Sequence, residues 1–345
     1  MCNIAGYVGT KPAAPILIEM MRKEEGLNAG FYTGIATIHE GKIYCAKLTG
    51  DLQHLLDHTD AANFPGTVGI IHSRTNSGGD DNWAHPFVGY SADGEVVSAY
   101  VANGSAGSFA PRKEEFNRLA CQLEADGYIM NAHLDLPNSH YMKVADGSAV
   151  HMSDVMCQLI QQYIDQDMPA SKAMEEAFCT MPSEIVGLLI SLKEPDHINY
   201  SRINAPMSVG FAPHGAYLAS AALVFPSDAG EPISLPACSA GFITKDTVTS
   251  FPYKNPPAKV APIDTRVRAE AYHTICTDLK EGPKTFPQLV KNIKPLFEAA
   301  DCLPAALAAY ETIYSLHKQG VLKIQKNRIK GTFEGLEAWR FELSL

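Results

Sequence analysis

The sequence predicts an α+β protein built in layers, and two observations lead to this prediction. Short runs rich in β-branched and aromatic residues recur along the first 220 residues with turn residues between them, which indicates at least one large sheet. Amphipathic helical patterns separate groups of these runs and carry the apolar stripe that covers a sheet face. Because 345 residues exceed the usual size of one domain, we expect either a large core with a smaller appendage or two domains.

The expected elements begin almost at the chain terminus. Residues 3–9 predict a strand that ends in glycine, and helical spacing follows over residues 15–25. Further helices are expected over residues 112–125, 154–165 and 171–180. The remaining expected strands cover residues 34–39, 42–47, 67–73, 96–102, 185–192, 197–202, 207–212 and 216–220.

The composition changes after residue 226. Residues 226–263 are rich in Pro, Ser and Gly, which is typical of the approach to a domain boundary. Residues 265–319 then carry three helical patterns, and residues 321–329 and 337–343 predict two strands around a polar turn. We therefore expect a main domain over residues 2–255, a linker over 256–264 and a winged-helix-like domain over 265–345.

Composition and charge exclude several classes of protein. A net charge of -10 argues against a nucleic acid partner, because phosphate binding depends on clustered Lys and Arg. No stretch approaches the roughly eighteen apolar residues of a membrane span, and the first residues lack the pattern of a signal peptide, so a cytoplasmic protein is expected. The eight cysteines include no CxxC pair, and no His/Cys cluster has the spacing of a metal site.

The cysteine at position 2 can carry both a thiol and a free α-amine in one residue. Since its side chain is small, we expect Met1 to be removed, which leaves Cys2 with a free α-amine of pKa about 7.7–8.0. That amine can act as a base toward the thiol of the same residue. A cysteine at this position is also common by chance, so the neighbouring motifs decide between a nucleophile and an ordinary cysteine.

Two further motifs close predicted strands. Arg74 ends the strand that contains His72, and an arginine fork binds a carboxylate in a bidentate way. Asn103 and Gly104 end another strand and offer one side-chain amide and one unobstructed backbone N–H, which together would form an oxyanion hole. Taken singly, these residues also fit a surface ion pair and a hairpin turn. Their occurrence together with Cys2 favours a site for acyl transfer.

Several stretches resemble the class II glutamine amidotransferases, and most of all the glutaminase half of the glucosamine-6-phosphate synthases. They occur in the order of the family and cover roughly residues 2–255. The resemblance implies a four-layer αββα sandwich of the N-terminal nucleophile hydrolase type. The stretches are CNIAGYVG, GFYTGIATIHEGKI, GIIHSR with NWAHPF, YVANGS, MSDVMCQLI and SRINAPMSVGFAPHGAYLASAALVFP.

The resemblance also implies a reaction. Glutamine would be hydrolysed to glutamate and ammonia through a γ-glutamyl thioester, without a metal or an organic cofactor. The implied roles are Cys2 as nucleophile, Asn103 and Gly104 as oxyanion hole, Arg74 as partner of the substrate α-carboxylate, Ser77 as a residue that seats the substrate, and Asp154 as partner of the α-ammonium.

The chain departs from the family at several positions. The segment around Ala29 lacks the arginine and aspartate of the family, and Thr75 replaces an aromatic residue. Ala102 stands where a histidine usually precedes Asn-Gly, and Ala221 stands where an aspartate is usual. An insertion lies near residues 131–148. These departures leave the substrate identity and the efficiency of the reaction open.

Other functions fit parts of the sequence. A glutamine-sensing regulator without turnover and an acylase-type amide hydrolase both agree with Cys2, although residues 10–19 lack the arginine and aspartate of the acylases. Residues 77–81 resemble an ATP-binding loop but lack its final serine. About 80 residues follow the linker, which is too few for an ammonia-using domain, so that partner is either a separate polypeptide, which we expect, or absent. The basic residues of the expected wing, which suit either DNA contact or protection of a strand edge, are Lys323, Lys326, Arg328 and Lys330.

Overall fold

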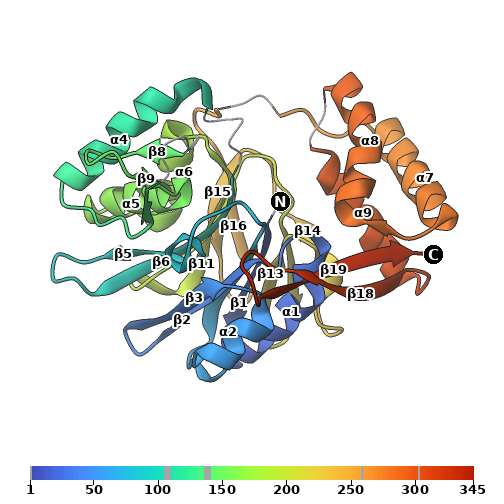
Figure 1. The fold of residues 1–345 in the computed structure, drawn as a ribbon, viewed down its shortest axis with the longest axis horizontal. Coiled ribbons are helices and arrows are strands. Elements are labelled where there is room, and N and C mark those ends of the chain that lie inside the picture. Colours follow the sequence, from blue (N-terminus) through green and yellow to red (C-terminus); the bar gives the residue numbers. More distant parts are fainter. Residues whose placement is uncertain (1, 105–109, 136–140, 258–259, 302–303) are drawn as a thin grey trace.

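The computed structural model describes residues 2–104, 110–135, 141–257, 260–301 and 304–345. Two large antiparallel sheets form the centre of this part of the chain (Figure 1). In the first sheet the order is β14 (Ile233–Ser234), β12 (Ser208–Ala212), β13 (Gly215–Ala219), β1 (Asn3–Gly9), β4 (Val68–Arg74), β2 (Tyr32–His39) and β3 (Lys42–Thr49). In the second it is β16 (Val248–Pro252), β15 (Ser239–Ile243), β11 (Glu194–Arg202), β10 (Glu184–Ser191), β6 (Val96–Gly104) and β5 (Phe87–Tyr90).

The two sheets pack face to face and helices cover their outer faces. A buried core between the sheets contains Ile4 and Ile70 from the first sheet and Val101 and Leu188 from the second. The first sheet is covered by α1 (Ala13–Asn28) and α2 (Leu52–His58), and the second by α4 (Lys113–Ala125), α5 (Met152–Asp165) and α6 (Ala170–Thr180) (Figure 1). The layers therefore follow the order helix, sheet, sheet, helix.

The sequence located the long elements and missed short ones. Each strand and helix expected before residue 221 is present, with ends that differ by a few residues. The Pro-rich segment after residue 226 is not only an approach to a boundary, because β14, β15 and β16 lie in it and extend both sheets. The insertion near residues 131–148 contributes a small sheet of β7 (His133–Leu134), β9 (Ala149–Val150) and β8 (Met142–Lys143). Residues 136–140 of the insertion and 258–259 of the expected linker lie outside the described residues.

The C-terminal module combines three helices with a small sheet. Its helices are α7 (Thr265–Glu281), α8 (Phe286–Ala300) and α9 (Ala305–Lys318), and its strands are β17 (Lys284–Thr285), β18 (Lys323–Lys330) and β19 (Glu337–Ser344), in the order β17, β19, β18. The two-residue β17 between the first two helices was not expected from the sequence. The helices form a group of their own near the C-terminus, while β18 and β19 extend toward α1 (Figure 1).

This module shares a hydrophobic core with the main body. The core that contains Leu17 of α1 also contains Ile313 of α9 and Phe341 of β19. A Cβ atom at Gly26 of α1 would lie 2.2 Å from the Phe341 ring, so glycine is required for this close approach. The two parts of the chain are therefore packed tightly at β19.

Three of the four basic residues of β18 make contacts within the chain. Lys326 donates to the backbone oxygen of Arg22 at 3.0 Å, and Arg328 forms an ion pair with Asp51. Lys323 donates to the oxygen of Leu345 at 3.1 Å. These internal contacts compete with a phosphate backbone for the three cations, which argues against the DNA-contact interpretation of the wing.

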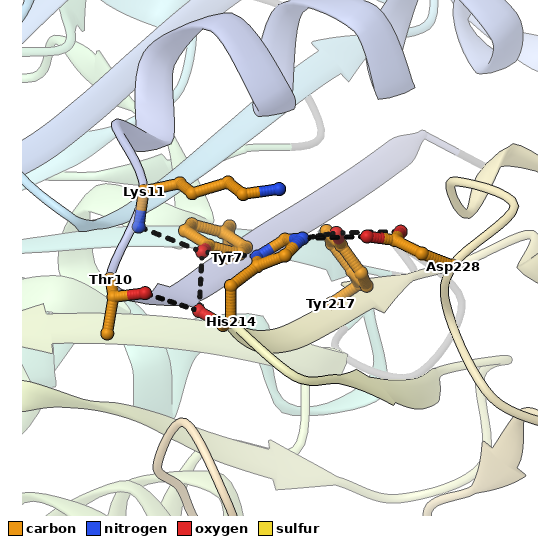
Figure 2. A network of polar contacts seen from close by, with 6 residues as sticks. All are labelled: Tyr7, Thr10, Lys11, His214, Tyr217 and Asp228. Carbon is orange, nitrogen blue, oxygen red and sulfur yellow. Dashed lines mark hydrogen bonds and ion pairs between the residues drawn. The ribbon is translucent and has the colours of Figure 1, made fainter.

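A network of polar contacts fixes the far end of β1. Tyr7 bonds through its hydroxyl to both the Nδ1 atom (3.0 Å) and the backbone oxygen (2.8 Å) of His214, in the turn between β12 and β13 (Figure 2). The Nε2 atom of His214 lies 2.8 Å from Asp228, and Tyr217 contacts both of these residues. The network ties the segment after β13 to the first strand.

Neither a membrane span nor a metal site is found in the part of the chain that the structure describes. No helix there is long and apolar enough to cross a membrane. No group of three or more His, Cys, Asp or Glu side chains there is arranged to hold a metal ion.

Candidate active site

Strand pairing brings the predicted nucleophile beside the predicted substrate-binding arginine. In the antiparallel pair of β1 and β4, Asn3 lies opposite Ser73, so that Cys2 and Arg74 are neighbours where the strands end. Asn103, next to the last residue of β6 in the second sheet, reaches Cys2 from the other side. The site therefore lies where the two sheets meet at one end of the sandwich.

A cavity of about 180 Å³ opens at this place. Four of the six predicted site residues line it, namely Cys2, Arg74, Ser77 and Gly104. The other lining residues are Thr75, His85, Ala102, Tyr141, His151, Met152 and Ser153.

Asn103 is tied to the backbone of Cys2. Its Oδ1 atom accepts from the Cys2 backbone nitrogen at 2.6 Å, and its Nδ2 atom donates to the Cys2 carbonyl oxygen at 3.0 Å. The side chain is 3% exposed and does not line the cavity, so it first of all fixes the position of the nucleophile. An amide nitrogen carries two hydrogens, so one donor of Asn103 remains for another acceptor.

Arg74 is buried and held rigidly. Its Nη1 atom donates to the oxygen of Trp83 at 3.0 Å and its Nη2 atom to the oxygen of Gly78 at 2.7 Å. The guanidinium stacks on the ring of Tyr32, 4.3 Å from its centroid. These contacts use two of five N–H donors and fix the plane of the group, which is the preorganisation that a carboxylate site requires.

Asp154, which the resemblance assigns to the substrate α-ammonium, forms hydrogen bonds with groups of the chain itself. Its Oδ2 atom accepts from the backbone nitrogens of Asn131 (2.8 Å) and Ala132 (2.9 Å), and its Oδ1 atom accepts from Gln158 (3.1 Å). Burial raises the pKa of this carboxyl, while Lys47 and the hydrogen bonds act in the opposite direction. Asp154 is 1% exposed and is absent from the cavity lining, so its position gives no support to a contact with the substrate ammonium.

Two buried histidines that the sequence did not single out stack against each other at the cavity, and one of them, His85, lines it. The rings of His72 and His85 stack with centroids 3.9 Å apart, and His72 Nε2 lies 3.1 Å from the oxygen of Ala102. Burial lowers the pKa of His72 to about 3, and burial together with the charge of His72 lowers that of His85 well below its usual value. Both rings are therefore neutral near pH 7, and no described residue forms a hydrogen bond with either nitrogen of His85.

The insertion supplies another wall of the cavity. Tyr141, directly before β8, lines the cavity and donates to the oxygen of Ser77 at 3.4 Å. Its ring meets Trp83 edge to face at 4.6 Å. The sequence indicated an insertion but gave no signal that its tyrosine returns to the site.

No family model matches the chain. The chain is 27% identical to a glutamine–fructose-6-phosphate aminotransferase of Thermosynechococcus vestitus over 227 residues. This aligned region is 64% of the chain and 31% of that protein. It is 24% identical to the enzyme of the same name from Pyrococcus horikoshii over 257 residues, and this aligned region is 72% of the chain and 37% of that protein. The chain is a homologue of class II glutamine amidotransferases.

The match to these amidotransferases concerns only part of them. The chain spans about a third of the length of the curated relatives that it matches. Solved structures extend the comparison to nearly the whole chain. A structure described as the allosteric regulatory enzyme of purine biosynthesis covers 97% of the chain with a TM-score of 0.61, and glutamine phosphoribosylpyrophosphate amidotransferase from B. subtilis covers 94% with a TM-score of 0.58. The matched regions are 67% and 66% of the two solved chains, and at 14% identity these matches establish a shared fold.

The segment that departs from the amidotransferases is packed against the C-terminal module. Gly30 adopts a positive φ of 98°, and its nitrogen donates to Ser73 Oγ at 2.9 Å. A Cβ atom at Gly30 would lie 3.5 Å from the nitrogen of Trp339 in β19. In this homologue, β19 therefore closes over the segment where the arginine and aspartate of the family are missing.

Proposed function

We propose that this chain hydrolyses L-glutamine to glutamate and ammonia at the cavity between its two sheets. The observation that carries the proposal is that Cys2 and Arg74, from adjacent strand ends, line the same cavity as Gly104. A nucleophile beside a rigid carboxylate-binding group and a backbone N–H is the arrangement that amide hydrolysis of an amino acid requires.

The proposed reaction begins when the Cys2 sulfur attacks the side-chain carbonyl carbon of glutamine. The α-amine of Cys2, freed by removal of Met1, accepts the thiol proton and passes it to the leaving nitrogen, so that ammonia departs and a γ-glutamyl thioester remains. Water then attacks the thioester carbonyl, and glutamate leaves as the thiol is restored. Met1 itself lies outside the described residues.

The remaining residues bind the substrate and stabilise the oxyanion of the tetrahedral intermediates. The backbone N–H of Gly104 and the second hydrogen of Asn103 Nδ2 form the oxyanion hole, while the guanidinium of Arg74 holds the α-carboxylate. Ser77 borders the substrate from the loop after β4. Its exposed side chain suits contact with a ligand that enters from solvent.

We further propose that the ammonia passes to a separate synthase subunit in the cytoplasm. The C-terminal residues form a three-helix module whose element order, helix, strand, helix, helix, strand, strand, supports a winged helix. The proposed domains remain residues 2–255 and 265–345 joined by a linker. Since three of the four cations of β18 contact the chain itself, the module is proposed to stabilise the glutaminase domain through β19 rather than to bind nucleic acid.

The test is release of glutamate from glutamine by the purified protein alone. Turnover that is lost in Cys2→Ala supports the proposal. Binding of glutamine without any release of glutamate would contradict it and favour a glutamine-sensing regulator. Hydrolysis of N-acyl substrates in place of glutamine would favour an acylase.

A further inference from the structure

One face of the Arg74 guanidinium is covered by an aromatic ring. Tyr32 lies directly opposite Arg74 in the antiparallel pair of β2 and β4, and its ring centroid is 4.3 Å from the central carbon of the guanidinium. Tyr32 is fully buried behind Arg74, which itself lines the cavity. A ring attracts a cation but carries no net charge, so the stack holds the guanidinium and leaves its charge for an anionic ligand.

The side chains of Tyr32 and Arg74 also hold the same loop. Tyr32 donates through its hydroxyl to the oxygen of Gly79 at 3.1 Å, and Arg74 donates through Nη2 to the oxygen of Gly78 at 2.7 Å. Both glycines adopt a positive φ, and a Cβ atom at Gly79 would lie 2.5 Å from the side chain of Trp83. The hydroxyl therefore anchors Tyr32 to a closely packed loop, and this anchor fixes where the ring lies against the guanidinium.

The turn between β18 and β19 reaches Tyr32 from the C-terminal module. Burial raises the pKa of Tyr32, while the charge of Arg74 and the side chain of Thr332 in this turn act in the opposite direction. The hydroxyl oxygen of Thr332 is buried. Phe333 of the same turn lines a hollow together with Asp80, the residue that follows the loop glycines. The module therefore packs against the support of Arg74 rather than against the cavity itself.

We infer that Tyr32 is a positioning residue for Arg74, and that the β18–β19 turn holds Tyr32 in place through Thr332. The inference rests on the proposed function, in which Arg74 binds the α-carboxylate of glutamine, and it gives the C-terminal module a role in that same site. A guanidinium binds a carboxylate in a bidentate way when its plane is held in the right direction. The module thus contributes to the affinity for glutamine as well as to the stability of the glutaminase domain.

Tyr32→Leu tests the positioning role with two substrates. 4-Aminobutanamide keeps the side-chain amide and the amine of glutamine but lacks the α-carboxylate, so it makes no use of Arg74. In the variant the KM for glutamine rises by about 10-fold, while kcat stays within about twofold because the nucleophile and the oxyanion hole are unchanged. The kcat/KM for 4-aminobutanamide changes by less than about threefold. Tyr32→Phe keeps the ring and holds the KM for glutamine within about threefold of the native value.

A double-mutant cycle tests the contribution of the C-terminal module. Thr332→Val removes the hydroxyl beside Tyr32 at nearly constant volume, and it raises the KM for glutamine by about threefold with kcat unchanged. The same change has no further effect in the Tyr32→Phe background, because the hydroxyl that Thr332 contacts is already absent. Thr244→Val is the matched control, in the turn between β15 and β16, and it leaves KM unchanged.

The matched control for the ring is Tyr44→Leu. This tyrosine of β3 meets Phe64 rather than a residue of the cavity, so its removal leaves the KM for glutamine unchanged. An unchanged KM in Tyr32→Leu, or equal losses for both substrates in a folded variant, would overturn the positioning role. Additive effects of Thr332→Val and Tyr32→Phe would overturn the role of the turn.

Binding measurements keep the inference separate from the proposed reaction. Calorimetric Kd values for glutamine and 4-aminobutanamide replace KM in a protein that binds glutamine without turnover, and the same ratios are expected. If Tyr32→Leu does not fold, the cycle of Tyr32→Phe and Thr332→Val decides the outcome. Hydrolysis of glutamine that is insensitive to all three changes would overturn the inference alone. A native protein that neither binds nor hydrolyses glutamine would overturn both the inference and the proposed function.

Discussion

The two ends of strand β1 carry polar clusters of opposite character. At the Tyr7 end, the hydroxyls and the imidazole of the network are paired with one another and with Asp228 (Figure 2). At the Cys2 end, buried polar atoms of His72, His85 and Glu184 have no hydrogen-bond partner among the described residues.

The difference separates a structural site from a binding site. A fully paired network contributes its full stabilisation to the fold without a ligand, because each group already has its hydrogen-bond partner. Unpaired buried groups reduce stability and are retained where a ligand completes them. We therefore expect changes near Cys2 to affect catalysis strongly, and changes near Tyr7 to affect stability alone.

The largest effect is expected for Cys2→Ala. Loss of the nucleophile lowers kcat for glutamine by at least about 10³-fold, because no other group can form the thioester. Glutamine binding remains within about tenfold, since the sulfur contributes to chemistry more than to ground-state affinity. Steady-state kinetics and calorimetric binding measure the two quantities, and substantial turnover by the variant would place the chemistry elsewhere.

A smaller loss is expected for Asn103→Ala. Removal of one oxyanion donor lowers kcat by about 10² to 10³-fold with little change in KM. Since Asn103 also holds the Cys2 backbone by two hydrogen bonds, the melting temperature falls as well. A lower melting temperature with unchanged kcat would mean that Asn103 serves only as a structural clamp.

Arg74→Lys tests recognition of the carboxylate. A point charge replaces a fork that is fixed by Trp83 and Gly78, so the KM for glutamine rises by about 10 to 100-fold. The kcat value changes less. An unchanged KM would indicate that the substrate carries no carboxylate at this position and would favour the acylase alternative.

The smallest effect on activity is expected at the other end of β1. Tyr7→Phe removes a hydroxyl that contacts His214 and the nitrogen of Lys11, and it lowers the free energy of unfolding by about 1–2 kcal/mol. The values of kcat and KM stay within about twofold of the native protein. Urea denaturation and kinetics on one preparation check both parts, and a loss of activity at native stability would break the contrast between the two ends.

The sequence predicted the parts of the fold that local patterns determine. Long strands such as β1 and β4 follow from apolar runs bounded by turn residues, and the family motifs located Cys2, Arg74 and Gly104. Two-residue strands such as β17 have no periodicity to detect. They exist only through pairing with a distant strand.

Contacts between residues that are distant in the sequence also limited the prediction of the site. Asp154 matched a motif, but the direction of its carboxylate depends on Asn131 and Ala132, which belong to an insertion. Tyr141 lines the cavity from a segment that carries no motif, and only the pairing of β10 with β6 places Glu184 beside Gly104. Local sequence does not contain such long-range contacts.

Covalent trapping of the active protein with a glutamine-like diazoketone tests the central claim most directly. Intact-mass and peptide analysis are expected to show one adduct, on the sulfur of Cys2, in a chain that has lost Met1. Glutamine in excess is expected to protect against the adduct. Full activity in a protein that retains Met1, or labelling of another cysteine such as Cys45 or Cys121 with loss of activity, would contradict an N-terminal cysteine nucleophile.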